Sequence, residues 1–129
     1  VVGMRALLAA GAMFVLAGNA PDASEAERLH PFDGEWAVDL RLSLEDAPYS
    51  KPMLIKIRDA NVVTGTFYGS VIEAGRIGAA QGRMCMAFRT SDNSGPYQHA
   101  ACLLDGQLVG QSWSEGRDFV NPWTAERKK

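Results

Sequence analysis

The sequence has no large excess of charge of either sign, few cysteines and histidines, and no very long apolar run. Its formal net charge is −2, so it lacks the basic surface that a nucleic-acid-binding protein needs. Its two histidines and two cysteines show no metal-ligand spacing, and no Gly-x-Ser-x-Gly elbow is present. We therefore expect no nucleic-acid partner, no metal, no cofactor, no catalytic residues and no enzyme activity.

The longest apolar run covers residues 6–17 and follows Arg5. It is shorter than the ~20 residues of a transmembrane helix but suits the core of a secretory signal peptide. We assign residues 1–17 to a signal peptide, 18–32 to a linker and 33–129 to one β-barrel domain, which predicts a secreted or periplasmic protein. A buried or membrane-retained N-terminal helix is the alternative, and cleavage of the signal peptide stays open.

Alternation of apolar and polar residues begins at Trp36 and continues to residue 44. The apolar set is Trp36, Val38, Leu40, Leu42 and Leu44. A period of two residues places this set on one face, so residues 36–44 are predicted to form a half-buried β-strand. The turn-rich segment 45–52, which contains two prolines, is predicted to be a loop.

Short strand patterns, separated by turn signals, fill the rest of the sequence. The predicted strands are 53–58, 62–69, 71–74, 83–90, 96–103, 107–114 and 119–127. Consecutive hairpins with almost no helix predict an all-β fold, namely an eight-stranded antiparallel up-and-down barrel. A two-sheet β-sandwich is the alternative. The polar faces carry too many charges, such as Asp39, Arg41 and Lys56, for an integral membrane barrel.

Gly34-x-Trp36 opens the first predicted strand, and Arg127 ends the last one. This arrangement resembles the calycin barrels, which include lipocalins, fatty-acid-binding proteins and avidins, and Thr64 to Phe67 is similar to the avidin branch. The resemblance implies that Trp36 plugs one end of the barrel, that Arg127 covers its ring, and that loop 45–52 is a lid over the other end.

Pairing strands 83–90 and 96–103 about an Asn93-Ser94 turn places Cys85 directly opposite Cys102. In an exported protein, two cysteines that meet in this way predict a structural disulfide. A shift of one residue in the pairing would separate the thiols onto opposite faces.

The same register places a mostly apolar set of side chains inside the barrel. With a three-residue turn at 104–106, that set is Met84, Met86, Phe88, Tyr97, His99, Ala101, Leu103, Val109, Gln111, Trp113, Phe119, Asn121 and Trp123. Polar groups in such a face must find partners, and a ligand is one such partner. The predicted lumen site is Tyr97, His99, Gln111, Trp113, Asn121 and Trp123. Alternatively, these polar groups bond one another or water, so an open or a filled lumen is equally compatible.

The predicted function is therefore an exported calycin-like barrel that binds a small, mostly apolar ligand in its lumen. One alternative is a small β-barrel inhibitor of periplasmic proteases, which would insert the segment 20–24 into a protease cleft. The other is a structural accessory module. The sequence predicts neither the identity of the ligand nor the oligomeric state.

Overall fold

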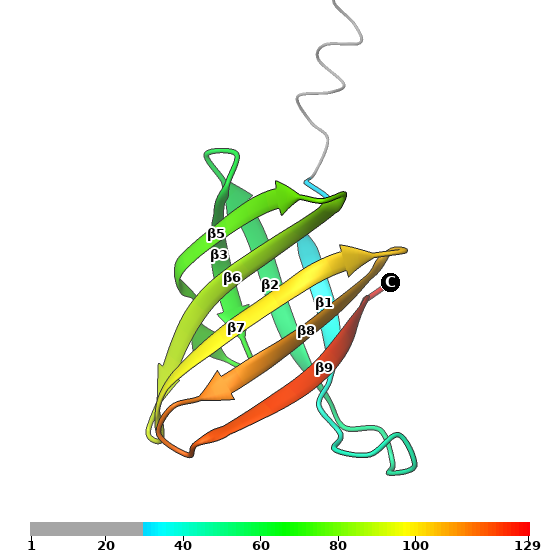
Figure 1. Cartoon of the computed structure of the whole chain (residues 1–129), viewed down its shortest axis with the longest axis vertical. Helices are drawn as coiled ribbons and strands as arrows, with labels where there is room; N and C mark the ends of the chain where they lie inside the picture. Colours follow the sequence, from blue (N-terminus) through cyan, green and yellow to red (C-terminus); the bar gives the residue numbers. More distant parts are fainter. Residues whose placement is uncertain (1–29) are drawn as a thin grey trace, which may run out of the picture. The chain divides into compact units, whose positions relative to one another are not determined.

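The computed structural model describes residues 30–129, and strands dominate this part of the chain (Figure 1). The strands are β1 (Gly34–Asp39), β2 (Ser50–Arg58), β3 (Val62–Phe67), β4 (Ser70–Val71), β5 (Glu73–Ala80), β6 (Arg83–Asp92), β7 (Gly95–Leu104), β8 (Gln107–Ser114) and β9 (Phe119–Arg127). All of them pair antiparallel, as predicted from the succession of hairpins.

The sheet closes on itself. Its nine strands follow the order β2-β1-β9-β8-β7-β6-β5-β3-β4, and β2 also pairs with β3. Leaving out the two-residue β4, which pairs only with β3, the other eight form a closed up-and-down ring. The barrel is therefore confirmed over the sandwich, and it is compatible with a calycin-like fold.

The two ends of the barrel differ in their connections (Figure 1). At one end, called the closed end below, lie the β2–β3, β5–β6 and β7–β8 turns and the C-terminus. At the other end, called the mouth below, lie the long β1–β2 loop and the β6–β7 and β8–β9 turns. Because consecutive strands are antiparallel, every strand that runs the full barrel height contributes residues to both ends.

The prediction for the first strand is wrong at its C-terminal end. β1 ends at Asp39, and the side chains of Leu42 and Leu44 are 86% and 84% exposed rather than part of the core. Arg41 redirects the chain: its side chain binds the Asp39 carboxylate at 2.9 Å and donates to the carbonyl of Asp46 at 3.2 Å. These contacts fold residues 40–49 into a loop instead of a longer strand.

The fourth predicted strand, 71–74, is wrong in its bounds: residue 71 ends β4, and residues 73–74 are only the start of the longer strand β5. β5 runs from Glu73 to Ala80, with a bulge between Glu73 and Arg76. Gly75 lies at the bulge, where a Cβ atom would stand 2.6 Å from the carbonyl oxygen of Val63. Only glycine allows this close approach of β3 and β5.

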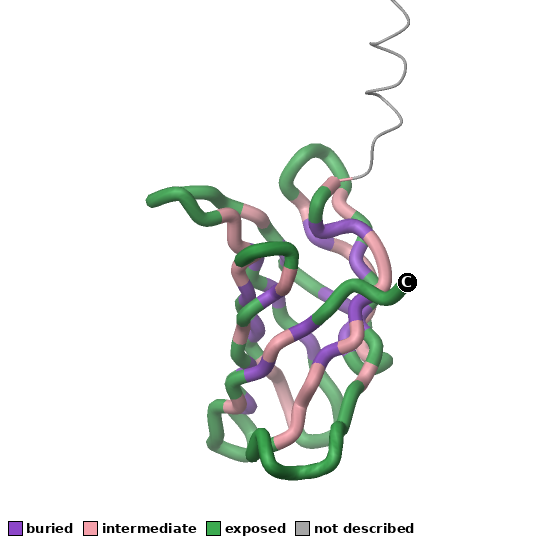
Figure 2. Tube along the Cα trace, turned by 90° about the vertical axis from the view of Figure 1, so that its right-hand side faces the viewer, coloured by how far each residue is buried: buried purple, intermediate pink, exposed green. Residues whose placement is uncertain are grey.

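Buried residues recur along the strands of the barrel (Figure 2), and the apolar ones form one core cluster. Its fully buried large side chains include Trp36, Phe32, Met53, Met86 and Leu108. The barrel unit spans Pro31–Lys129. Phe32, which the sequence placed in the linker, is therefore a core residue.

The predicted contact between Trp36 and Arg127 is present. The two residues pair across β1 and β9, and the guanidinium carbon of Arg127 lies 4.4 Å from the centre of the Trp36 ring. Arg127 also donates to the backbone carbonyls of Pro31 and Asp33. Gly34 has a φ of +128°, and a Cβ there would come within 2.9 Å of the guanidinium, which gives a physical reason for the Gly-x-Trp spacing.

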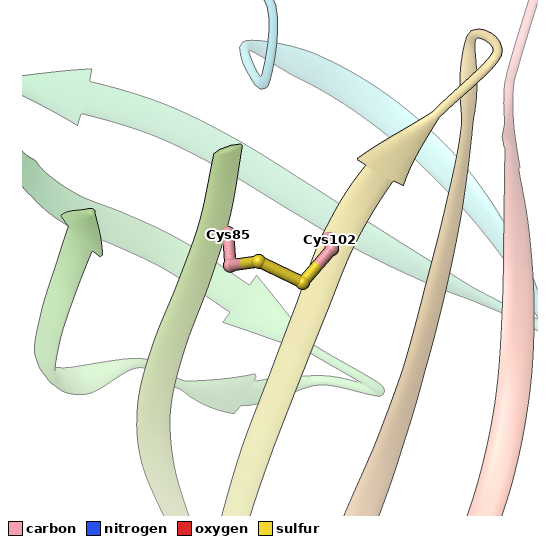
Figure 3. The surroundings of a disulfide bond; sticks show 2 residues. All are labelled: Cys85 and Cys102. Atoms are coloured by element: carbon pink, nitrogen blue, oxygen red, sulfur yellow. A yellow bond between two sulfur atoms is a disulfide. The ribbon is translucent and has the colours of Figure 1, made fainter. Parts of the chain in front are cut away.

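Cys85 and Cys102 lie directly opposite each other on β6 and β7 and form the predicted disulfide (Figure 3). Their neighbours Met86 and Ala101 point into the core. By alternation, the disulfide therefore lies on the outer face of the barrel. A disulfide is typical of an oxidising compartment.

Across residues 30–129, no helix has the length and hydropathy to cross a membrane.

Candidate ligand cavity

An open cavity of about 1020 Å³ occupies the mouth half of the barrel. Its outer lining comes from the β1–β2 loop and from the residues at the β3–β4 and β8–β9 turns. Tyr97 on β7 and Asn121 on β9 line its wall, and Phe67, Thr90, His99 and Ser112 line it further in. The barrel is therefore filled at one end and hollow at the other.

The cavity floor lies where the side chains of His99 and Ser112 meet. These residues pair across β7 and β8. The next inward-facing pair toward the closed end is Ala101 and Gly110, followed on β8 by the buried Leu108, and none of the three lines the cavity. Trp123 fills the same deeper layer from β9. The cavity thus ends at a polar layer that covers the apolar core.

This polar layer is a continuous hydrogen-bonded chain. Thr90 Oγ1 lies 2.8 Å from His99 Nε2, and His99 Nδ1 lies 2.6 Å from Ser112 Oγ. Trp123 Nε1 donates to the same Ser112 oxygen over 2.8 Å. The Thr90, His99, Ser112 and Trp123 side chains, called the floor chain below, come from four adjacent strands, β6 to β9. Each buried polar group therefore has at least one partner, as buried polar groups require.

Aromatic rings surround His99. The centre of its ring lies 4.3 Å from that of Phe67 and 4.9 Å from that of Phe88, and the Tyr97 ring stacks at 6.1 Å. Burial in this apolar setting penalises the charged imidazolium and lowers the pKa of His99 to about 4. His99 is therefore neutral at physiological pH, with one ring nitrogen a donor and the other an acceptor.

Charged side chains lie at the mouth rather than at the floor. Arg41, Asp46, Asp92 and Arg117 line the cavity, and all four belong to the mouth loops or the adjoining strand end. The Arg117 guanidinium stacks 4.9 Å from the Phe119 ring. The side chains that line the cavity are therefore charged at the mouth and neutral but polar at the floor.

A second aromatic group shapes the rim. The hydroxyls of Tyr49 and Tyr68 lie 2.7 Å apart, and the Lys51 ammonium lies 5.1 and 5.0 Å from the centres of their rings. The hydrogen bond with Tyr68 raises the pKa of Tyr49. This cluster attaches the end of the β1–β2 loop to the β3–β4 turn.

The structure brings together part of the predicted lumen site. Tyr97, His99 and Asn121 line the cavity, and Trp123 lies just below it, bonded to Ser112. Gln111 and Trp113 do not belong to this group: both are exposed on the outer face, Trp113 by 47%. The predicted inward orientation of these two residues is wrong.

The cause is the β7–β8 turn, which is one residue shorter than predicted. Leu104 pairs with Gln107, which leaves Asp105 and Gly106 as a two-residue turn with φ values of 52° and 79°. A one-residue change in the turn moves every side chain of the next strand to the opposite face. Leu108, Ser112 and Ser114 point inward as a result, and Val109, also predicted inside, is 42% exposed.

Thr90 and Ser112 are the two cavity-lining residues of the floor chain that the predicted site did not include. The Asp105-Gly106 dipeptide was the available signal, because Asp-Gly strongly favours two-residue hairpin turns. The correct turn length would have placed Ser112 beside His99. Thr90 lies on the same face of β6 as Phe88, so the predicted alternation already pointed it inward.

The Ser112–His99 pair has the spacing of a nucleophile and a base, but its surroundings are not those of a catalytic triad. The second ring nitrogen of His99 bonds the Thr90 hydroxyl, not a carboxylate. Asp118 lies in the β8–β9 turn, where its N–H bonds the Ser114 carbonyl. Within residues 30–129, no group of three or more His, Cys, Asp or Glu side chains could hold a metal ion.

No family model matches the chain, and neither a curated protein nor a solved structure matches it at a significant level. Two predicted features, the signal peptide at 1–17 and the inhibitory segment at 20–24, lie outside the described residues.

Proposed function

We propose that this protein is an exported barrel that binds a small, mostly apolar ligand in the mouth half of its lumen, without catalysing a reaction. The observation that carries the proposal is the hollow half of the barrel, with its cavity of about 1020 Å³. Small-molecule pockets typically measure 300–1,000 Å³ and combine apolar walls with a few polar groups. The aromatic wall and the floor chain supply both parts.

The arrangement of the core supports binding over a purely structural role. A barrel that acts only as a spacer gains stability by filling its lumen, because close packing contributes dispersion energy. Here the buried core ends at the layer of Phe67, Phe88 and His99, and the space between this layer and the mouth is open. The disulfide, which is typical of an oxidising compartment, and the apolar run at 6–17 support a secreted or periplasmic location.

A neutral fluorescent dye, N-phenyl-1-naphthylamine, tests the proposal directly. We expect its emission to rise when it is titrated into the purified protein and to fall again when 2-nonanone is added. In Asn121→Trp, an indole from β9 would occupy the cavity, so dye affinity should fall about tenfold or more, which corresponds to 1.4 kcal/mol.

Gln111→Trp provides the matched control, because it adds the same side chain to the outer face of the neighbouring strand β8. Its dye affinity should equal that of the wild type. Absence of dye binding to the wild type, or equal losses in the two variants, would contradict lumen binding. Near-ultraviolet circular dichroism of both variants establishes that the barrel is folded in each.

A further inference from the structure

The floor chain has one more donor hydrogen than it has hydrogen bonds. The Trp123 indole, the neutral His99 ring and the hydroxyls of Thr90 and Ser112 each carry one hydrogen, which makes four. The chain contains three contacts, Thr90–His99, His99–Ser112 and Ser112–Trp123. One hydrogen is therefore left over in either tautomer of His99.

The tautomer decides which hydroxyl keeps this hydrogen. If Ser112 donates to His99 Nδ1, then Nε2–H donates to Thr90 and the Thr90 hydroxyl hydrogen is unused. If Nδ1–H donates to Ser112, then Thr90 donates to Nε2 and the Ser112 hydrogen is unused. Thr90 and Ser112 both line the cavity, so in both cases the spare hydrogen belongs to a hydroxyl at the floor.

Within residues 30–129, neither hydroxyl has another hydrogen-bonding partner. Thr90 is 3% and Ser112 7% exposed. A buried donor without an acceptor is costly, whereas an oxygen acceptor with one unused lone pair is more readily tolerated. The floor therefore lacks an acceptor atom rather than a donor.

This acceptor is uncharged. The groups that contact His99 are Phe67 from β3, Phe88 and Thr90 from β6, Tyr97 from β7 and Ser112 from β8. Tyr97 is the one titratable group among these contacts, and the charged residues of the cavity lie at the mouth. A carboxylate at the floor would lose its hydration without gaining a cation, which costs several kcal/mol.

From this count we infer that the ligand is an apolar molecule with a neutral carbonyl-type oxygen at one end, such as a ketone, aldehyde or ester, and that this oxygen binds the floor chain. This inference rests on the proposed function and makes it more specific. The ligand enters with its oxygen first, its hydrocarbon part lies against Phe67, Tyr97 and Phe119, and any charged group stays at the rim with Arg117.

A pair of isosteric probes tests the inference. 2-Nonanone carries a carbonyl oxygen where 2-methyl-1-nonene carries a methylene group, and both are titrated against bound N-phenyl-1-naphthylamine. The quantity of interest is the ratio of the two dissociation constants in the wild type and in the quadruple variant Thr90→Val/His99→Phe/Ser112→Ala/Trp123→Phe, in which no donor of the floor chain remains. We expect the preference for the ketone to fall about five- to tenfold in the variant, the range of one hydrogen bond.

Two single variants serve as controls. Thr90→Ser keeps a hydroxyl at the floor, and Tyr97→Phe removes one from the cavity wall, so both should keep the wild-type ratio. If Tyr97→Phe abolishes the preference instead, the oxygen binds at the wall and the inference is wrong. Buried polar groups replaced together by apolar groups of similar shape often leave stability nearly unchanged. The quadruple variant replaces all four groups of the floor chain, and near-ultraviolet circular dichroism establishes that it is folded.

A measurement on the unaltered floor gives a second test. The sequence has two histidines, His30 and His99, so ¹⁵N-histidine labelling of His30→Gln isolates the His99 ring. The ketone should shift the Nδ1 and Nε2 resonances more than the alkene, because its oxygen fixes one tautomer. Equal binding of both probes with equal His99 shifts would overturn this inference and leave the proposed function intact. Failure of both probes and the dye to bind would overturn both.

Discussion

The closed half and the mouth half of the barrel are built from the same long strands, yet they use their interiors differently. In the closed half, polar atoms bond to fixed backbone groups: Trp36 Nε1 donates to the Phe32 carbonyl at 2.9 Å, and Asp33 accepts the Ile57 N–H at 2.7 Å. In the mouth half, the buried side chains of Thr90, His99 and Ser112 bond one another through rotatable groups. One half is fixed and filled, and the other is adjustable and open.

This difference shows how a small barrel can hold a cavity. The open mouth half makes fewer packing contacts than a filled lumen would, so contacts in another part of the barrel have to supply the stability. The closed half supplies it through a fully buried indole, a guanidinium over that ring and a well-packed apolar layer. Substitutions should therefore affect folding strongly in the closed half and affect ligand binding mainly in the mouth half.

The largest effect is expected from removing the plug of the closed end. Trp36→Ala should lower the free energy of unfolding by about 3–5 kcal/mol, the range for a large buried aromatic side chain. Trp113→Ala removes an indole that is 47% exposed on the outer face and should cost less than about 1 kcal/mol. Urea unfolding of both variants measures the difference, and similar losses would contradict the assigned core.

The second effect concerns pH and lies in the mouth half. Burial lowers the pKa of His99 to about 4, whereas an unfolded chain has a histidine pKa of about 6.5. Between these values the unfolded state binds more protons, so stability should fall by about 3 kcal/mol as pH decreases from 6.5 to 4. Below pH 4 this group contributes no further loss.

Urea unfolding at several pH values measures this slope. His99→Phe, which replaces the ring without a titratable group, removes the contribution, so the slope of the variant should be shallower in this window. Contributions to the slope that the two proteins share are removed when the slope of the variant is subtracted from that of the wild type. Identical slopes would mean that the pKa of His99 is the same in the folded and the unfolded state.

Loss of the disulfide should destabilise the barrel while leaving the ligand cavity intact. Cys85 and Cys102 are separated by 17 residues, and a loop of that size contributes roughly 3 kcal/mol in the chain-entropy model. We expect Cys85→Ala/Cys102→Ala to be less stable by roughly 2–3 kcal/mol. Its affinity for N-phenyl-1-naphthylamine should be unchanged, because the disulfide lies on the outer face. A loss of dye affinity in a folded variant would contradict that placement.

The smallest effect is expected at the C-terminus. Arg127→Ala should lower stability by about 1–2 kcal/mol, because it removes a cation–π contact and the bonds to the carbonyls of Pro31 and Asp33. Lys128→Ala removes an exposed ion pair with Glu35, whose atoms are 3.4 Å apart, and should change stability by less than about 0.5 kcal/mol. Thermal unfolding of the two variants checks the difference. Equal effects would mean that Arg127 does not cover the Trp36 ring in solution.

The fold could be predicted from the sequence wherever alternation and turn signals agreed. The Asn93-Ser94 turn fixed the β6–β7 register and with it the Cys85–Cys102 disulfide. Alternation alone failed after Asp39, because Leu42 and Leu44 continue the pattern while the contacts of Arg41 fold the chain into a loop. A strand pattern contains no information about such side-chain contacts to the backbone.

The candidate site could be predicted only in part. His99 and Tyr97 followed from the β6–β7 register, but Gln111 and Trp113 were placed inside because the length of one turn was overestimated. Ser112 was missed for the same reason. The cavity in the mouth half depends on the total volume of the side chains that point into the closed ring of strands. No local pattern in the sequence predicts this total.

The β1–β2 loop has a consequence for how this protein can diversify. Arg41, Asp39 and Asp46 hold the loop through contacts within residues 39–46, and the exposed Leu42 and Leu44 contribute little to the barrel core. The identity of those two residues can therefore change without disturbing the eight-stranded ring. The sequence at the rim of the cavity can therefore vary independently of the residues that hold the fold, and under the proposed function this loop is a position at which ligand preference can change on a constant scaffold.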